Sequence, residues 1–168
     1  MADDATVRRL MDDFRRIVQA LRSSHRAAGN LELTGAQLFV LKVLGENGAP
    51  MSINELAEAT ETTQSTVSAV TARLIDRGLI ASSRSSEDAR RAEVSLTPRG
   101  RALHRKAPAT VAQIRLAAAL KDLADKDADV LARLLDAIVA TMGIGSEPAP
   151  MMFDEERPAS RQPARNRK

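Results

Sequence analysis

One stretch, from Ser52 to Gly78, constrains the fold more than any other part of the chain, because it carries two helix-start signals and one helix-stop signal. Ser52 stands three residues before Glu55, so each side chain can bond a backbone N–H that the first helical turn leaves free. Thr63 is expected to cap a second helix, and Gly78 to follow its end. Residues 60–62 separate the two helices, because their threonines are poor helix formers. Two short helices joined by a tight turn form a helix-turn-helix.

The second of these helices has two chemically distinct faces. Apolar side chains recur at spacings of three, four and one and are expected to face inward, namely Val67, Val70, Leu74 and Ile75. The side chains expected to face outward are one amide and several small hydroxyls, namely Gln64, Ser65, Thr66, Ser68 and Thr71. Glutamine can pair with adenine through two hydrogen bonds, and serine or threonine can bond several bases. This face is therefore a candidate DNA-reading surface; the alternative is an ordinary solvated helix face.

A β-hairpin is expected directly after the second helix. Residues 79–84 and 92–97 alternate partly between apolar and polar side chains, and the polar segment 85–91 between them is typical of a turn. Arginines at the tip of such a hairpin suit the negative potential of a narrow minor groove, and a nearby aspartate can hold one of them by an ion pair. The alternative is a soluble loop. The candidate contacts here are Arg84, Asp88, Arg90 and Arg91.

The same region carries an ordered series of short motifs: Leu33-Thr34-x-x-Gln37, Glu55-Leu56-Ala57, Ser65-Thr66-Val67-Ser68, Arg73-Leu74, Arg77-Gly78-Leu79-Ile80, Asp88-x-Arg90 and Leu96-Thr97-x-x-Gly100. In this order they resemble the multiple-antibiotic-resistance regulator (MarR) family of bacterial winged-helix transcription factors. The resemblance departs from the family pattern at Ala69, where arginine is common, at Arg91, where a small residue is usual, and at Glu61, where glycine is common.

The resemblance implies a homodimer that binds a palindromic operator in double-stranded DNA. Its two recognition helices would enter successive major grooves, and its wings would reach the flanking minor grooves. Such proteins are commonly repressors that respond to a small molecule held between the helical region and the DNA-binding lobe. The chain nominates no effector of its own, because it has three phenylalanines and neither tryptophan nor tyrosine.

The expected fold is mainly α-helical with a small β-hairpin wing, a winged helix-turn-helix joined to a helical dimerisation region. Helices over residues 4–27 and in the region 128–142 carry apolar side chains at steps of three and four residues, as a helical dimer interface requires. Thr97 and Pro98 start another long helix, which Pro108 is expected to kink. The expected regions are an N-terminal dimerisation helix (1–30), the winged helix-turn-helix (31–100), C-terminal dimerisation helices (101–145) and a disordered basic tail (146–168).

Composition narrows the function. The chain of 168 residues has no cysteine, which excludes disulfides, thiolate metal sites and thiol redox switches. Its two histidines, His25 and His104, lie on separate predicted helices, and no phosphate-binding loop or hydrolase motif is present. We therefore expect no enzyme, metal or cofactor. Without a leader or an apolar run long enough for a membrane span, a cytoplasmic protein is expected. The alternative function is a winged-helix protein-interaction module that has lost specific DNA binding.

Overall fold

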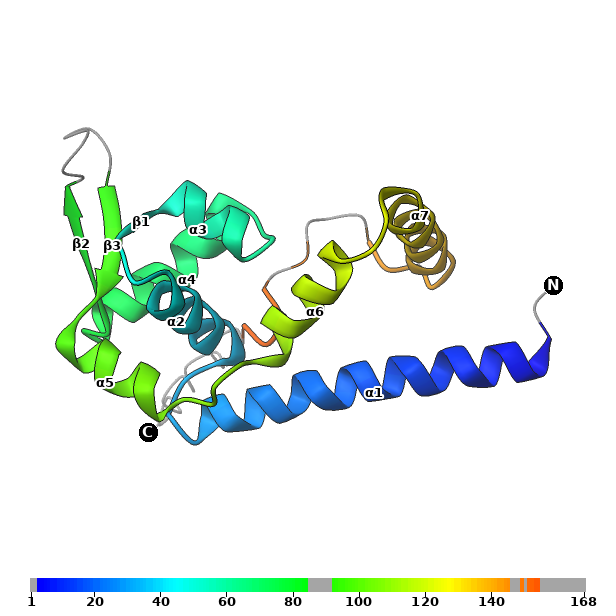
Figure 1. The fold of residues 1–168 in the computed structure, drawn as a ribbon, viewed down its shortest axis with the longest axis horizontal. Coiled ribbons are helices and arrows are strands. Elements are labelled where there is room, and N and C mark those ends of the chain that lie inside the picture. The colour runs from blue at the N-terminus through cyan, green and yellow to red at the C-terminus, as the bar shows by residue number, and fades with distance from the viewer. Residues whose placement is uncertain (1–2, 85–91, 146–148, 150, 155–168) are drawn as a thin grey trace, which may run out of the picture.

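The computed structural model describes residues 3–84, 92–145, 149 and 151–154. It is mainly helical with a small antiparallel sheet, as the sequence predicted (Figure 1). In chain order its elements are α1 (Asp4–Gly29), α2 (Gly35–Asn47), β1 (Met51–Ser52), α3 (Ile53–Ala59), α4 (Gln64–Asp76), β2 (Ile80–Arg84), β3 (Ala92–Leu96), α5 (Pro98–Lys106), α6 (Ala112–Lys121) and α7 (Asp125–Thr141).

Side-chain hydrogen bonds fix the helix starts and confirm the predicted pairing of Ser52 with Glu55. Thr34 Oγ1 accepts from the Gln37 N–H at 3.1 Å while Gln37 Oε1 accepts from the Thr34 N–H, also at 3.1 Å. Ser52 and Glu55 form the same reciprocal pair at the start of α3. At the end of α4, Gly78 has φ +66°, and the N–H groups of residues 78 and 79 bond back to carbonyls of the last turn.

The three strands lie in the order β1-β3-β2. Ile80 of β2 pairs with Leu96, and Met51 of β1 pairs with Val94. The hairpin of β2 and β3 was predicted, whereas no strand was predicted at β1. A strand of two residues is too short to show an alternating pattern, so its sequence carries no signal.

The core surrounds α2, which is buried over most of its circumference. Leu38 and Leu41 of α2, Leu56 of α3, Leu74 of α4 and Ile80 of β2 are at most 2% exposed. These contacts join the helix-turn-helix to the sheet, so the second helix of the motif has a fixed orientation relative to the wing.

The remaining helices extend away from this core. In Figure 1, the N-terminal part of α1 extends far beyond the core, and α7 lies apart from the core. Only the C-terminal part of α1 packs, against α2 and α6. Every residue of α7 is exposed or half-buried. No helix in the described part of the chain is long and apolar enough to span a membrane.

Two predictions about the C-terminal third were wrong. Pro108 does not kink one long helix: α5 ends at Lys106 and a separate α6 begins at Ala112. The reason is that a residue before proline avoids the helical region, and Ala107 is extended, with ψ 156°. The predicted disordered tail from residue 146 onward is also contradicted in part, because Met151 is buried, Phe153 stacks on His25 of α1 and Asp154 pairs with Arg73 of α4.

Candidate nucleic-acid interface

Helix α4 presents a polar face to solvent and an apolar face to the core. Val67, Val70 and Leu74 are fully buried. On the opposite side Gln64, Ser65 and Ser68 are exposed, as predicted. Ser65 and Ser68 have short side chains, so the helix backbone can approach a partner surface closely there.

A cluster of hydroxyls organises the N-terminal turn of α4. Thr63 Oγ1 lies 2.9 Å from Ser65 Oγ and 2.9 Å from Thr66 Oγ1, and it accepts from the Thr66 N–H at 3.3 Å. The cap residue therefore orients the two hydroxyls that follow it. Thr66 is half-buried, so of these two hydroxyls that of Ser65 is the more accessible.

Thr71 does not lie on the polar face, which corrects the prediction. Its side chain is 3% exposed, and its Oγ1 has no hydrogen-bond partner among the described residues. Residue 71 is four positions after Val67 and follows Val70, so the buried stripe runs through positions 67, 70, 71 and 74. Ile75, which was expected to face inward, is 38% exposed.

The wing is present, but only its base is described. Arg84 is exposed at the end of β2 and pairs with Ala92 across the hairpin. Asp88, Arg90 and Arg91 lie in segment 85–91, outside the described residues, so the expected ion pair at the tip stays a prediction.

The two arginines in and next to α4 tie it to its surroundings. Arg77 bonds the side chain of Gln37 at 3.3 Å and the carbonyl oxygen of Glu32. Arg73 donates to the Ala69 carbonyl at 3.1 Å and to Asp154 at 2.7 Å. The contacts Arg77–Glu32 and Arg73–Asp154 could not be predicted from local sequence patterns. Each joins residues more than forty positions apart.

A cavity of about 340 Å³ lies between the helix-turn-helix and α6. Its walls include Phe39 of α2, Thr60 and Glu61 of the turn, and Gln113 and Leu116 of α6. Gln113 is 3% exposed, and its Oε1 has no partner in the part of the chain that the structure describes. Across the same wall Lys121 Nζ lies 2.7 Å from Glu61 Oε1. The cavity thus combines apolar walls with a buried amide, and sequence patterns had not singled out that amide.

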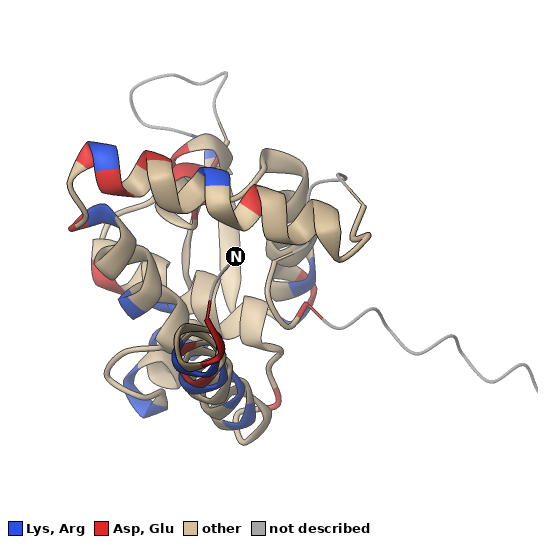
Figure 2. Cartoon of the chain, turned by 90° about the vertical axis from the view of Figure 1, so that its right-hand side faces the viewer, with Lys and Arg blue, Asp and Glu red and all other residues tan. Residues whose placement is uncertain are grey.

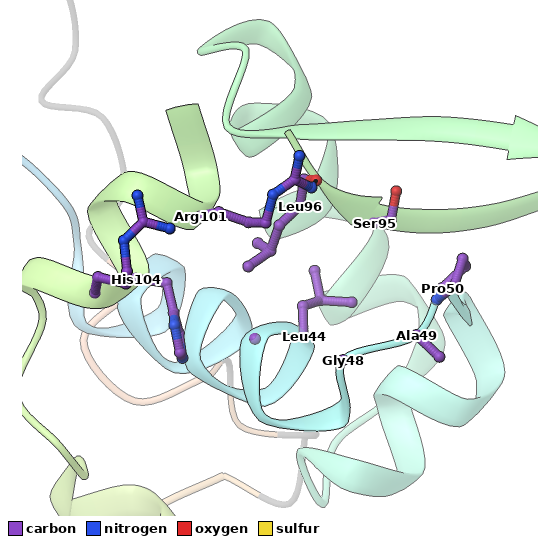
Figure 3. A pocket seen from close by; sticks show the side chains of 10 residues that line it. Leu44, Gly48, Ala49, Pro50, Ser95, Leu96, Arg101 and His104 are labelled. Atoms are coloured by element: carbon purple, nitrogen blue, oxygen red, sulfur yellow. Dashed lines mark hydrogen bonds between the residues drawn. The ribbon is translucent and has the colours of Figure 1, made fainter. Parts of the chain in front are cut away.

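A second pocket, of about 370 Å³, lies between the end of α2, the base of β3 and α5 (Figure 3). Arg101 donates to the Leu96 carbonyl at 2.6 Å, and the His104 ring points toward α2 (Figure 3). Burial, reinforced by the Lys42 ammonium, lowers the pKa of His104 below its ordinary value. This imidazole is therefore mainly neutral at neutral pH.

Positively and negatively charged side chains do not gather on separate faces of the helical region. Figure 2 shows lysine and arginine mixed with aspartate and glutamate along α1 and α7. In the described ranges no group of three or more histidine, aspartate or glutamate side chains is placed to hold a metal ion.

Comparisons with known proteins match this geometry. The sequence profile of the MarR family matches residues 31–91, which contain the helix-turn-helix and most of the wing. An uncharacterised helix-turn-helix transcriptional regulator of Bacillus subtilis, YhjH, is 32% identical over 73 residues. That match spans 44% of this chain and 41% of the relative, less than half the length of either protein.

Solved structures extend the likeness beyond the profile. A probable transcriptional regulator from Pseudomonas aeruginosa is 33% identical, with 74% of this chain and 92% of that chain covered and a TM-score of 0.51. The fold is also that of apo MarR from Escherichia coli, at 19% identity, 83% and 98% coverage and a TM-score of 0.52. With the profile match over its winged helix and this likeness across most of its length, the chain belongs to the MarR family of winged helix-turn-helix transcriptional regulators.

Proposed function

We propose that this protein is a homodimeric, sequence-specific DNA-binding repressor whose DNA affinity responds to a small molecule. The observation that carries the proposal is the exposed polar face of α4, with Gln64, Ser65 and Ser68 directed away from a fully buried apolar face and a wing alongside. The family is one of transcription regulators and not of enzymes, in agreement with the absence of catalytic motifs from the sequence.

In this proposal the N-terminal half of α4 enters the major groove. Gln64 would read a base edge through its amide, while Ser65 and Ser68 would bond bases or phosphates. The free N–H groups and positive dipole end of the helix also favour a nearby phosphate. Because Thr71 is buried, it has no part in the contact.

The wing would supply the second contact. Arg84 at its base is exposed, and Arg90 and Arg91 follow at the tip in the sequence. Arginines that reach a narrow minor groove add affinity and sensitivity to DNA shape.

Dimerisation is supported by the apolar side chains that the monomer leaves exposed. On α1 these are Val7, Leu10, Met11, Phe14, Ile17 and Val18, each at least 40% exposed. On α7 they are Val130, Leu134, Ile138 and Val139, each at least 39% exposed. Continuous apolar stripes of this length are typical of surfaces that a partner covers. A two-fold dimer would place two recognition helices on half-sites about 10 base pairs apart.

The cavity beside Gln113 supports the proposed response to a small molecule. It lies where α6 of the helical region meets the turn that precedes α4. A ligand there would shift the DNA-binding equilibrium only if it favoured one position of α4 over another. Its apolar walls, and the Gln113 Oε1 that has no partner among the described residues, suit a small, largely apolar molecule with one hydrogen-bond donor.

The test is fluorescence anisotropy of the purified protein with the promoter DNA that flanks its own gene, a shuffled duplex and a salt series. We expect one dimer per site, preference for the promoter duplex and a steep salt dependence. Gln64→Ala should weaken specific binding by about 1–3 kcal/mol while nonspecific binding stays the same. Ser23→Ala, an exposed change on α1 away from this face, is the control.

A second candidate function is a protein-interaction module. It is favoured by Ala69, which leaves the exposed face of α4 without the arginine that is common in the family. Equal affinity for the promoter and shuffled duplexes, combined with no specific site in a genome-wide pull-down, would support this alternative and contradict the DNA-binding proposal.

A further inference from the structure

The chain returns to the winged helix after α7. Residues 151–154 lie beside the start of α2 and close to α6 (Figure 1). Met151 is 6% exposed and belongs to the main hydrophobic core. Met151, Met152 and Phe153 are the three consecutive apolar residues in an otherwise polar C-terminal sequence. We call Met151–Asp154 the strap.

The strap fits a notch at the beginning of α2. The Phe153 ring stacks on His25 of α1, with centroids 4.8 Å apart and an angle of 15° between the planes. A Cβ atom on Gly35 would lie 2.8 Å from the Phe153 Cβ, so the notch exists only because residue 35 has no side chain. Phe153 itself has φ +58°, a conformation that non-glycine residues keep only where surrounding contacts hold it.

The next residue joins the strap to α4. Asp154 Oδ2 lies 2.7 Å from Arg73 Nη2, and the Asp154 side chain is only 13% exposed. The same guanidinium donates through Nε to the Ala69 carbonyl. Arg73 is thereby fixed both to its own helix and to the strap, and its charge faces a carboxylate.

The contacts of the strap join elements that are far apart in the sequence. The strap follows α7, whose exposed apolar stripe is part of the proposed dimer surface, and it touches α1, α2 and α4 at once. It therefore connects the helical region to the recognition helix in addition to the chain links through α2 and α6.

We propose that the strap positions the recognition helix, with Asp154 acting through Arg73 as a positioning residue for DNA binding. The inference rests on the proposed DNA-binding function. With the strap in place, α4 has one orientation relative to the dimer region, and the two recognition helices of a dimer keep one spacing. When the ion pair is lost, α4 takes up a wider range of positions. Binding to an operator with the preferred spacing must then restrict α4 to one position, which costs free energy. Operators with altered spacing then lose less affinity.

The test compares Asp154→Ala with Asp76→Ala in the full-length protein. Asp76 is exposed on α4, and its removal changes the charge by the same amount without breaking a described contact. Each variant is titrated against the operator and against operators lengthened by one or two base pairs between half-sites. We expect Asp154→Ala to reduce the discrimination between spacings at least threefold, and Asp76→Ala to retain it. Equal increases in affinity for all duplexes in both variants would show a charge effect only and would overturn the proposal.

Two further variants separate positioning from general stability. Asp154→Asn keeps the shape of the side chain and should preserve part of the discrimination. Arg73→Ala combined with Asp154→Ala should discriminate no less than Asp154→Ala alone, because both substitutions remove the same contact. A fully additive loss would contradict the assignment of Arg73 as the partner through which Asp154 acts.

Hydrogen exchange of the DNA-free protein tests the role of the strap independently of DNA binding. Amides of residues 68–73 should exchange several-fold faster in Asp154→Ala than in the wild type, while those of α3 stay the same. If the wild type binds no specific DNA, the proposed function fails, and the exchange data still decide whether the strap holds α4. Unchanged exchange in α4 would overturn the proposal whatever the DNA result.

Discussion

At the scale of single residues, the junction around Thr97 is held by hydrogen bonds that the sequence pattern predicts only in part. Thr97 Oγ1 donates to the carbonyls of Gly78 and Leu79, at 2.8 and 3.1 Å, and accepts from the Gly100 N–H at 3.0 Å. One hydroxyl thus joins the end of α4, the start of β2 and the start of α5. The sequence predicted Thr97 as a helix cap, but its bonds to residues 78 and 79 depend on the folded arrangement of the wing.

Gly100→Ala should destabilise the protein strongly. An added Cβ would collide with the Leu79 carbonyl oxygen, and backbone cannot move aside as a flexible side chain can. We expect a loss of about 3 kcal/mol in the free energy of unfolding, measured by urea denaturation. Gly29→Ala is the matched control, because nothing lies within 4 Å of its added Cβ, and it should leave the urea midpoint nearly unchanged. Similar midpoints for the two variants would contradict the close approach at residue 100.

His104 should make stability depend on pH. Burial first, then Lys42, lowers the pKa of this imidazole, while Glu46 opposes the shift. The unfolded chain therefore binds a proton more readily than the folded one. The contribution is fully present above the unfolded-state pKa of about 6.5 and is lost as the pH falls through the lower folded-state value. Thermal unfolding at pH 7 and pH 5.5 should show a smaller drop in Tm for His104→Gln than for the wild type; an equal drop would assign the acid sensitivity to other groups.

At the scale of elements, local signals predicted the helix starts, and long-range contacts explain what they missed. The caps at Ser52 and Thr63 were predicted because each involves residues within four positions. Thr71 was misplaced because a hydroxyl was taken as outward-facing, although its position falls within the buried stripe. The strap was missed because short apolar segments without periodicity show no partner in the sequence.

Helix α6 illustrates a cap that local reasoning cannot find. Its N-cap residue, Val111, has no capping side chain, but Ser24 Oγ of α1 accepts from the Ala112 N–H at 2.8 Å. Ser24→Ala should cost about 1 kcal/mol of unfolding free energy, because it leaves that N–H without its partner. Ser23→Ala brings the same gain in helix propensity and loses only an exposed hydrogen bond from Arg26, so it is the control. Chemical denaturation of both variants measures the difference, and its absence would mean that the Ser24 bond adds no stability.

At the scale of the whole molecule, the arrangement separates a compact winged helix from two helices with uncovered apolar faces. The winged helix could be predicted almost completely, because its motifs are local and occur in a fixed order. The positions of α1 and α7 could not be predicted, since their apolar stripes indicate only that another surface covers them. In the monomer neither stripe is buried by the other (Figure 1). A second copy of the chain, which presents the same two stripes, would bury all of them at once under two-fold symmetry.

Leu134→Glu should therefore dissociate the proposed dimer. Leu134 is 54% exposed in the monomer, so the substitution leaves the fold intact but would bury an unpaired carboxylate between subunits. Light scattering after gel filtration should show a monomer, and affinity for a two-half-site operator should fall more than tenfold because the second contact is no longer intramolecular. Arg133→Glu, one position away and also exposed, adds negative charge to the same helix and should remain dimeric. If both variants stay dimeric, α7 lies outside the interface, and the stripe on α1 must form it alone.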